Sequence, residues 1–103
     1  MADALEIAAL VENELAVIDP DKAKIIRRCL IAPHNVIRRW DYGVEKYDCW
    51  TVLEIPSSKV DVAYCAYGFG PKSPWGLVWR NDTTIGPDSC WYPTLLDAFD
   101  EGV

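Results

Sequence analysis

The first thirty-nine residues of this chain contain no aromatic side chain, whereas eleven of its twelve aromatic residues lie between Trp40 and Tyr92. No apolar run approaches the ~18 residues that a membrane helix needs. No basic residue occurs among the first twenty, which argues against the positively charged start of a secretory signal. We therefore expect a cytoplasmic protein.

Cysteine pairs of the CxxC type are also lacking. The four cysteines are separated by 20, 16 and 25 residues, and His34 is the only histidine that could add a nitrogen ligand. We expect small, partly buried hydrophobic cysteines, no metal and no cofactor, and keep a zinc site or a disulfide as alternatives. Cys49 and Cys65 flank a predicted hairpin and could face each other across it.

Positive charge is scarce overall. The net charge of −6 disfavours nonspecific attraction to nucleic acid or anionic lipid, so we expect neither as a partner. One segment differs, because residues Lys22–Arg39 include six basic and no acidic side chains. We call this stretch the basic segment.

The N-terminal part has helical periodicity. Apolar residues from Ile7 to Ile18 recur every three or four positions, which predicts an amphipathic helix. Asp19 followed by Pro20 is typical of the start of a second helix, which we expect to end before Pro33. Thr94 and Asp97 resemble a capping box and predict a short final helix before Gly102.

Beyond Pro33 the pattern changes to that of strands. The predicted strands are 35–40, 50–55, 60–67 and 75–80, with loops at 68–74 and 81–89. The second and third form a hairpin. At 103 residues, half of them apolar, the chain is predicted to be a single domain, 1–103, of the α+β class. We expect two N-terminal helices packed on an antiparallel sheet of about four strands, closed by a short C-terminal helix.

Two groups of side chains suggest binding sites. If the second helix approached the following strand, four arginines could hold a phosphate or carboxylate: Arg27, Arg28, Arg38 and Arg39. The alternative is a solvated helix face.

An aromatic platform for sugars, bases or a protein could form from Trp50, Tyr64, Tyr67, Trp75, Trp79, Trp91 and Tyr92. Most of these side chains would instead serve as core. Trp79 and Trp91 border the polar 81–89 loop and are the best candidates for exposure. No nucleophile or acid–base signature accompanies them, so we do not expect an enzyme.

Several short segments resemble a family of small bacterial cytoplasmic proteins of undefined function. They are Trp40–Gly43, Cys49–Glu54, Ala63–Cys65, Gly68–Pro71, Pro74–Val78 and Trp91–Phe99. The resemblance covers residues 25 to 100. Less specifically, the chain is similar to immunity proteins that protect bacteria from polymorphic or contact-dependent toxins. The resemblance carries over no functional residues.

The function that we predict is protein binding, as a stoichiometric inhibitor or immunity protein that occludes a toxin's active site. An acidic inhibitor would be steered to a basic cleft and held there by aromatic anchors. The expected contact residues are Trp79, Asp82, Asp88, Trp91, Asp97 and Asp100. The alternative is a small-ligand or carbohydrate-binding module that uses the aromatic face and the four arginines.

Overall fold

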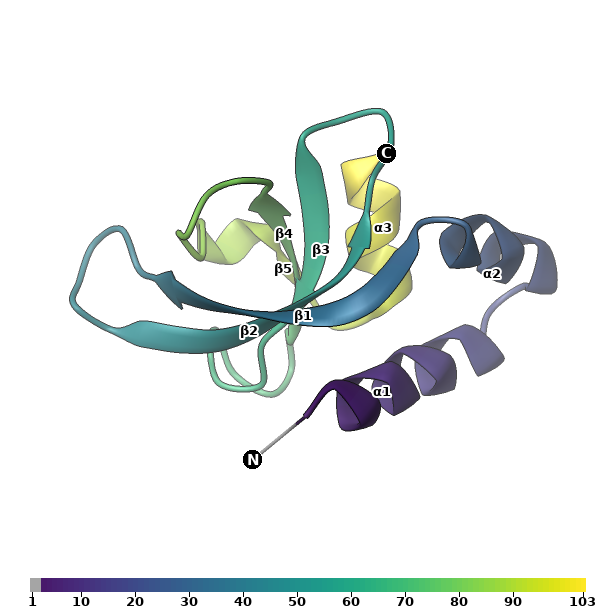
Figure 1. The fold of residues 1–103 in the computed structure, drawn as a ribbon, viewed down its shortest axis with the longest axis horizontal. Coiled ribbons are helices and arrows are strands. Elements are labelled where there is room, and N and C mark those ends of the chain that lie inside the picture. Colours follow the sequence, from purple (N-terminus) through teal and green to yellow (C-terminus); the bar gives the residue numbers. More distant parts are fainter. Residues whose placement is uncertain (1–2) are drawn as a thin grey trace.

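The computed structural model describes residues 3–103, except for the side chain of Asp88. The chain forms three α-helices, one short 3₁₀ helix and five strands (Figure 1). In chain order these are α1 (Ala4–Ala16), α2 (Pro20–Arg27), β1 (Leu30–Arg39), β2 (Lys46–Glu54), β3 (Val60–Tyr64), β4 (Trp75–Trp79), η1 (Asp88–Cys90), β5 (Trp91–Tyr92) and α3 (Leu95–Gly102). The α+β prediction is confirmed. None of the helices in 3–103 is long and apolar enough to cross a membrane.

The helices begin where their capping residues predict. Asp19 accepts hydrogen bonds from the amides of Asp21 and Lys22, and Pro20 is the first residue of α2. Thr94 accepts a hydrogen bond from the amide of Asp97 at 3.1 Å, which starts α3.

All strands are antiparallel and follow the chain in the order β1-β2-β3-β4-β5. β1 begins five residues earlier than predicted and includes Pro33, which the sheet tolerates because the register shifts between Leu30 and His34. β3 ends at Tyr64, three residues before the predicted end, and the two-residue β5 was not predicted.

The helices cover one face of this sheet. α1 packs on β1 and β2, whereas α3 packs on β3, β4 and β5 (Figure 1). Their apolar stripes form the main core with the sheet, and the largest fully buried side chains there are Ile7, Ile26, Leu53, Ile55 and Leu95.

The other face has a second, smaller core made of Cys49, Ala63, Cys65, Val78, Ile85 and Trp91. The chain between β4 and β5 covers this face and reaches β1, where Arg39 bonds to Thr83 and Ile85 through the backbone. Both faces are therefore covered, and Asp61, Ala63 and Cys65 are buried although alternation alone predicted a half-buried strand.

Candidate functional site

The most exposed tryptophan side chain of the second half, Trp79, lies at the end of β4 and is 60% exposed. β5 pairs only with Trp75 and Gly76, so the rest of β4 has no neighbouring strand on that side. α3 packs on β4 and ends at Gly102. Gly102 lies close to Ile55, since a Cβ added to Gly102 would be 2.3 Å from Cδ1 of Ile55. The end of α3 and Trp79 line the same cleft.

A cleft of about 200 Å³ lies beside Trp79, between β4, the β4–η1 loop and the end of α3. We call it the edge cleft. Its lining residues are Val60, Leu77, Val78, Trp79, Thr84, Gly86, Pro87, Cys90, Glu101 and Gly102. Apolar side chains predominate and Glu101 supplies the only charge among them. An apolar cleft with one carboxylate at its wall suits an aliphatic or aromatic anchor that has a basic neighbour.

The β4–η1 loop next to the cleft is held in place by its own backbone and by β1. Asn81 takes the left-handed conformation with φ of 66°, which asparagine adopts more readily than most residues. The carboxylate of Asp82 accepts hydrogen bonds from the amides of Thr83 at 2.6 Å and Thr84 at 3.2 Å. These bonds hold the loop in one conformation, as aspartate side chains often do at turns.

Arg38, on β1, binds this loop through its side chain. It is 2% exposed, and its Nη1 donates to the carbonyl oxygens of Asp82 at 2.9 Å and Thr84 at 3.1 Å. Its Nε has no hydrogen-bond partner among the described residues. Burial lowers the pKa of the guanidinium, while the carboxylates of Asp61 and Asp82 oppose that shift. Arg38 thus ties the loop to the sheet.

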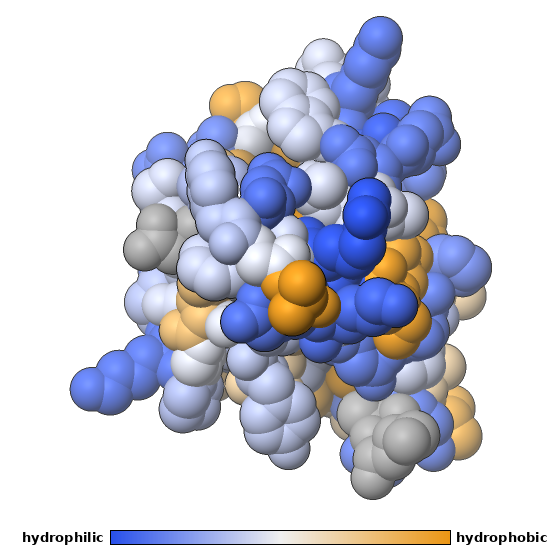
Figure 2. All heavy atoms as spheres, turned by 90° about the vertical axis from the view of Figure 1, so that its left-hand side faces the viewer, coloured by the Kyte–Doolittle hydropathy of each residue, from blue (hydrophilic) through white to orange (hydrophobic). Residues whose placement is uncertain are grey.

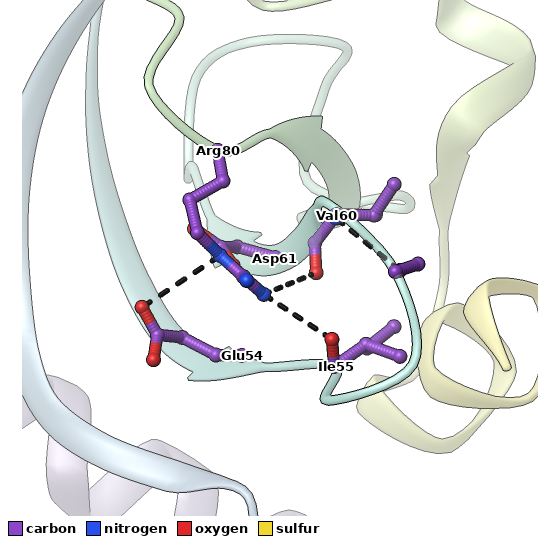
Figure 3. A network of polar contacts seen from close by, with 6 residues as sticks. Glu54, Ile55, Val60, Asp61 and Arg80 are labelled. Carbon is purple, nitrogen blue, oxygen red and sulfur yellow. Dashed lines mark hydrogen bonds and ion pairs between the residues drawn. The ribbon is translucent and has the colours of Figure 1, made fainter.

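A second ionic group fastens the β2–β3 turn (Figure 3). Arg80 Nε donates to Asp61 Oδ1 at 2.8 Å, and its Nη2 donates to the carbonyl oxygens of Ile55 and Val60 at 3.2 and 3.3 Å. Glu54 lies 3.7 Å from the same Nε. Among the side chains that the structure describes, three polar or charged ones are buried, and all three line one polar hollow of about 510 Å³: Arg38, Thr51 and Asp61. His34 also lines it, but no cysteine does.

The four arginines of the predicted anion site do not come together. Arg27 and Arg28 precede β1, whereas Arg38 and Arg39 lie at its far end, and a strand of ten residues spans about 30 Å. Arg27 pairs with Glu12 at 2.6 Å, and this hydrogen bond lowers the pKa of Glu12 and raises that of Arg27. The basic side chains of this segment therefore have different surroundings: those of α2 are solvated, whereas Arg38 is buried and binds the β4–η1 loop.

The predicted contact residues also separate. Trp79 and Asp82 are both exposed and lie three residues apart in the chain. Trp91, by contrast, is only 5% exposed, and its Nε1 donates to the Ile85 carbonyl at 2.9 Å. Asp97 is exposed on α3, one turn before Glu101 and on the same side of the helix. Asp100 points to α2, where Lys22 pairs with it at 3.0 Å. The side chain of Asp88 lies outside what the structure describes.

The thiols of Cys49 and Cys65 interact across β2 and β3, and all four cysteines are free. Their hydrogen bond, together with burial, raises the pKa of Cys49. The same bond, with the backbone amides of Tyr67 and Gly68, lowers the pKa of Cys65 to about 7 against the cost of burial. Within residues 3–103, no three His, Cys, Asp or Glu side chains gather as metal ligands.

Comparisons with protein-family models, curated proteins and solved structures found no match to this chain. The resemblance to immunity proteins therefore stays a prediction, and function has to be argued from the geometry.

Sequence reasoning did not identify most of the edge cleft. Leu77, Pro87 and Glu101 come from three segments, and only the packing of α3 against β4 places them together. In the sequence, Glu101 on the last turn of α3 looks like any other solvated acidic residue of a helix.

Proposed function

We propose that this protein is a protein-binding module that acts as a stoichiometric inhibitor, an immunity protein, of a bacterial toxin domain. The observation that carries the proposal is the exposed Trp79 beside an apolar cleft. Exposed tryptophans at the margin of a pocket are frequent anchors of protein interfaces, because they bury a large apolar area with little loss of conformational freedom.

Charge supports the same proposal. Glu101 lies in the wall of the edge cleft, the exposed Asp82 belongs to the same loop as Thr84 and Gly86 of that wall, and the chain carries a net charge of −6. A partner with a basic active-site cleft would be attracted to this end of the molecule and would associate faster at low salt. Inhibition would follow from occlusion of that cleft, without turnover and without a cofactor.

The surface near the β1–β2 turn provides a control residue that lies away from the edge cleft. In Figure 2 this side is largely hydrophilic, and its hydrophobic side chains form small separate groups. Tyr42, on that turn, is 81% exposed. It therefore offers a matched control for Trp79, because both are exposed aromatic residues.

The test is capture of a partner from the source organism with three forms of the tagged protein. Wild type and Tyr42→Ala should recover the same protein at low salt, and Trp79→Ala should recover at least about 30-fold less at limiting concentration, as loss of a hot-spot tryptophan implies. The purified partner should lose its activity at one equivalent of inhibitor. Equal recovery by both variants, or inhibition that needs catalytic turnover, would contradict the proposal.

A further inference from the structure

A second hollow, of about 560 Å³, lies between the N-terminal half of α1 and the adjoining ends of β2 and β3. We call it the aromatic hollow. Its lining residues are Glu6, Leu10, Asp48, Trp50, Tyr64, Ala66 and Tyr67. The volume is within the range of small-molecule sites, which are commonly lined by aromatic side chains with a few polar groups.

Three aromatic side chains shape this hollow. Trp50 and Tyr64 are directly opposite each other in the β2–β3 register and are both half-buried. Tyr64 is held by an edge-to-face contact with Trp75, at 4.9 Å between ring centroids. Tyr67, which follows β3, is 87% exposed. The hollow thus combines two half-buried aromatic rings on paired strands with a third ring that is exposed.

The charges in the aromatic hollow are all negative. Glu6 and Asp48 contribute carboxylates, and none of the described lining residues is basic. Asp48 is oriented by a hydrogen bond from the side-chain amide of Asn35. The Glu6 carboxylate makes no hydrogen bond or ion pair with any other residue that the structure describes. An anionic ligand would be repelled here, whereas a cation would be attracted both by the carboxylates and by the ring faces.

We infer that the aromatic hollow binds a small organic cation that carries a quaternary or alkylated ammonium group. Such a group is attracted to the faces of tryptophan and tyrosine, and its methyl groups gain apolar contact that a hydrated inorganic cation would not. This ligand class is opposite in charge to the anion that the four arginines suggested. The site is also distinct from the edge cleft, because none of its lining residues is shared.

The first experiment is a titration of the ¹⁵N-labelled protein with choline and with 3,3-dimethylbutan-1-ol, which has the same shape but carbon in place of the charged nitrogen. Choline should shift the Trp50 indole signal in a saturable way, with the signal assigned by its loss in Trp50→Phe. The neutral alcohol should bind at least about tenfold more weakly, since it lacks the cation–π and carboxylate attraction. Equal binding of the two compounds, or no saturable shift with choline, would overturn the inference.

Variants separate the rings from the charges. Tyr67→Ala should weaken choline binding about fivefold, the effect of losing one cation–π contact, while Tyr42→Ala should leave it unchanged. Asp48→Asn and Glu6→Gln should each weaken binding and reduce its salt dependence. Because Tyr67 and Glu6 are exposed, these changes should leave the fold intact, which the unchanged remainder of the NMR spectrum would verify. If none of these variants weakens choline binding, the cation binds at another surface and the proposed site is refuted.

The ammonium group could be free or part of a lipid headgroup. Cosedimentation with phosphatidylcholine vesicles distinguishes these sources. Choline binding without cosedimentation supports a free cation, and cosedimentation that choline competes away supports the headgroup through the same hollow. Cosedimentation that choline and Tyr67→Ala both leave unchanged would contradict binding of the headgroup in this hollow.

Discussion

Replacement of Gly76 by alanine should destabilise the protein strongly, because Trp91 occupies the space above its Cα. Gly76 and Trp91 are paired across β4 and β5. A Cβ at position 76 would lie 2.3, 2.4 and 2.5 Å from Cδ2, Cε2 and Cε3 of the indole. The ring is 5% exposed, donates to the Ile85 carbonyl at 2.9 Å and packs against Phe69 with 5.9 Å between ring centroids. It therefore cannot move aside without losing contacts.

The magnitude follows from three effects on the free energy of unfolding. Overpacking of a rigid contact costs up to about 3 kcal/mol. Displacement of the indole costs about 1 kcal/mol for its hydrogen bond. The lower conformational entropy of unfolded alanine returns about 0.5–1 kcal/mol. The net loss should be about 3 kcal/mol, which for a domain of this size lowers the melting midpoint by about 12–24 °C.

Urea denaturation of four proteins tests this reasoning: wild type, Gly76→Ala, Trp91→Leu and the double variant. The cost of Gly76→Ala should fall below about 1 kcal/mol when Trp91 is leucine, giving a coupling of at least about 2 kcal/mol. Gly68→Ala is the control, since its Cβ would approach Cδ1 of Ile85 at 2.9 Å and Sγ of Cys65 at 3.2 Å, both at side-chain ends, and should cost under about 1 kcal/mol. An equal cost of Gly76→Ala in both backgrounds would refute the account.

Three further substitutions report on other contacts. Asp61→Asn should lower the free energy of unfolding by about 1–3 kcal/mol in urea, because it removes the buried negative charge 2.8 Å from Arg80 Nε, and no change would contradict a structural role for the ion pair. The absorbance of the native protein at 240 nm should rise with pH around 7 as Cys65 forms a thiolate, and Cys65→Ser should abolish this step; a first step near 9 would contradict it. Thr94→Ala should cost about 1 kcal/mol through loss of the bond from the Asp97 amide, while Thr94→Ser should retain most of the stability.

The elements with local signals were predictable from the sequence. Asp19-Pro20 and Thr94 mark helix starts because their side chains bond to amides two or three residues away. The alternation in 60–64 and the turn at 56–59 likewise predict the hairpin. These features depend on neighbours in the chain, so they can be recognised without tertiary information.

The features that were missed depend on contacts between distant segments. Trp79 and Trp91 both border the polar loop in the sequence, yet one is exposed and the other is buried. The difference arises because no strand pairs with β4 beside Trp79, whereas β5 and the Ile85 carbonyl hold Trp91 on the second core. Arg38 and Arg39 are adjacent in sequence, but one is buried and the other exposed, as alternation along a strand requires.

The proposal that this protein inhibits a partner through the edge cleft is tested most directly by the rate constants of binding to the captured partner. Surface plasmon resonance at several salt concentrations would compare wild type with Trp79→Ala and Tyr42→Ala. Association of the wild type should slow as salt rises, and Trp79→Ala should dissociate at least about 30-fold faster while Tyr42→Ala behaves as wild type. Association that is independent of salt, with equal dissociation of the two variants, would contradict it.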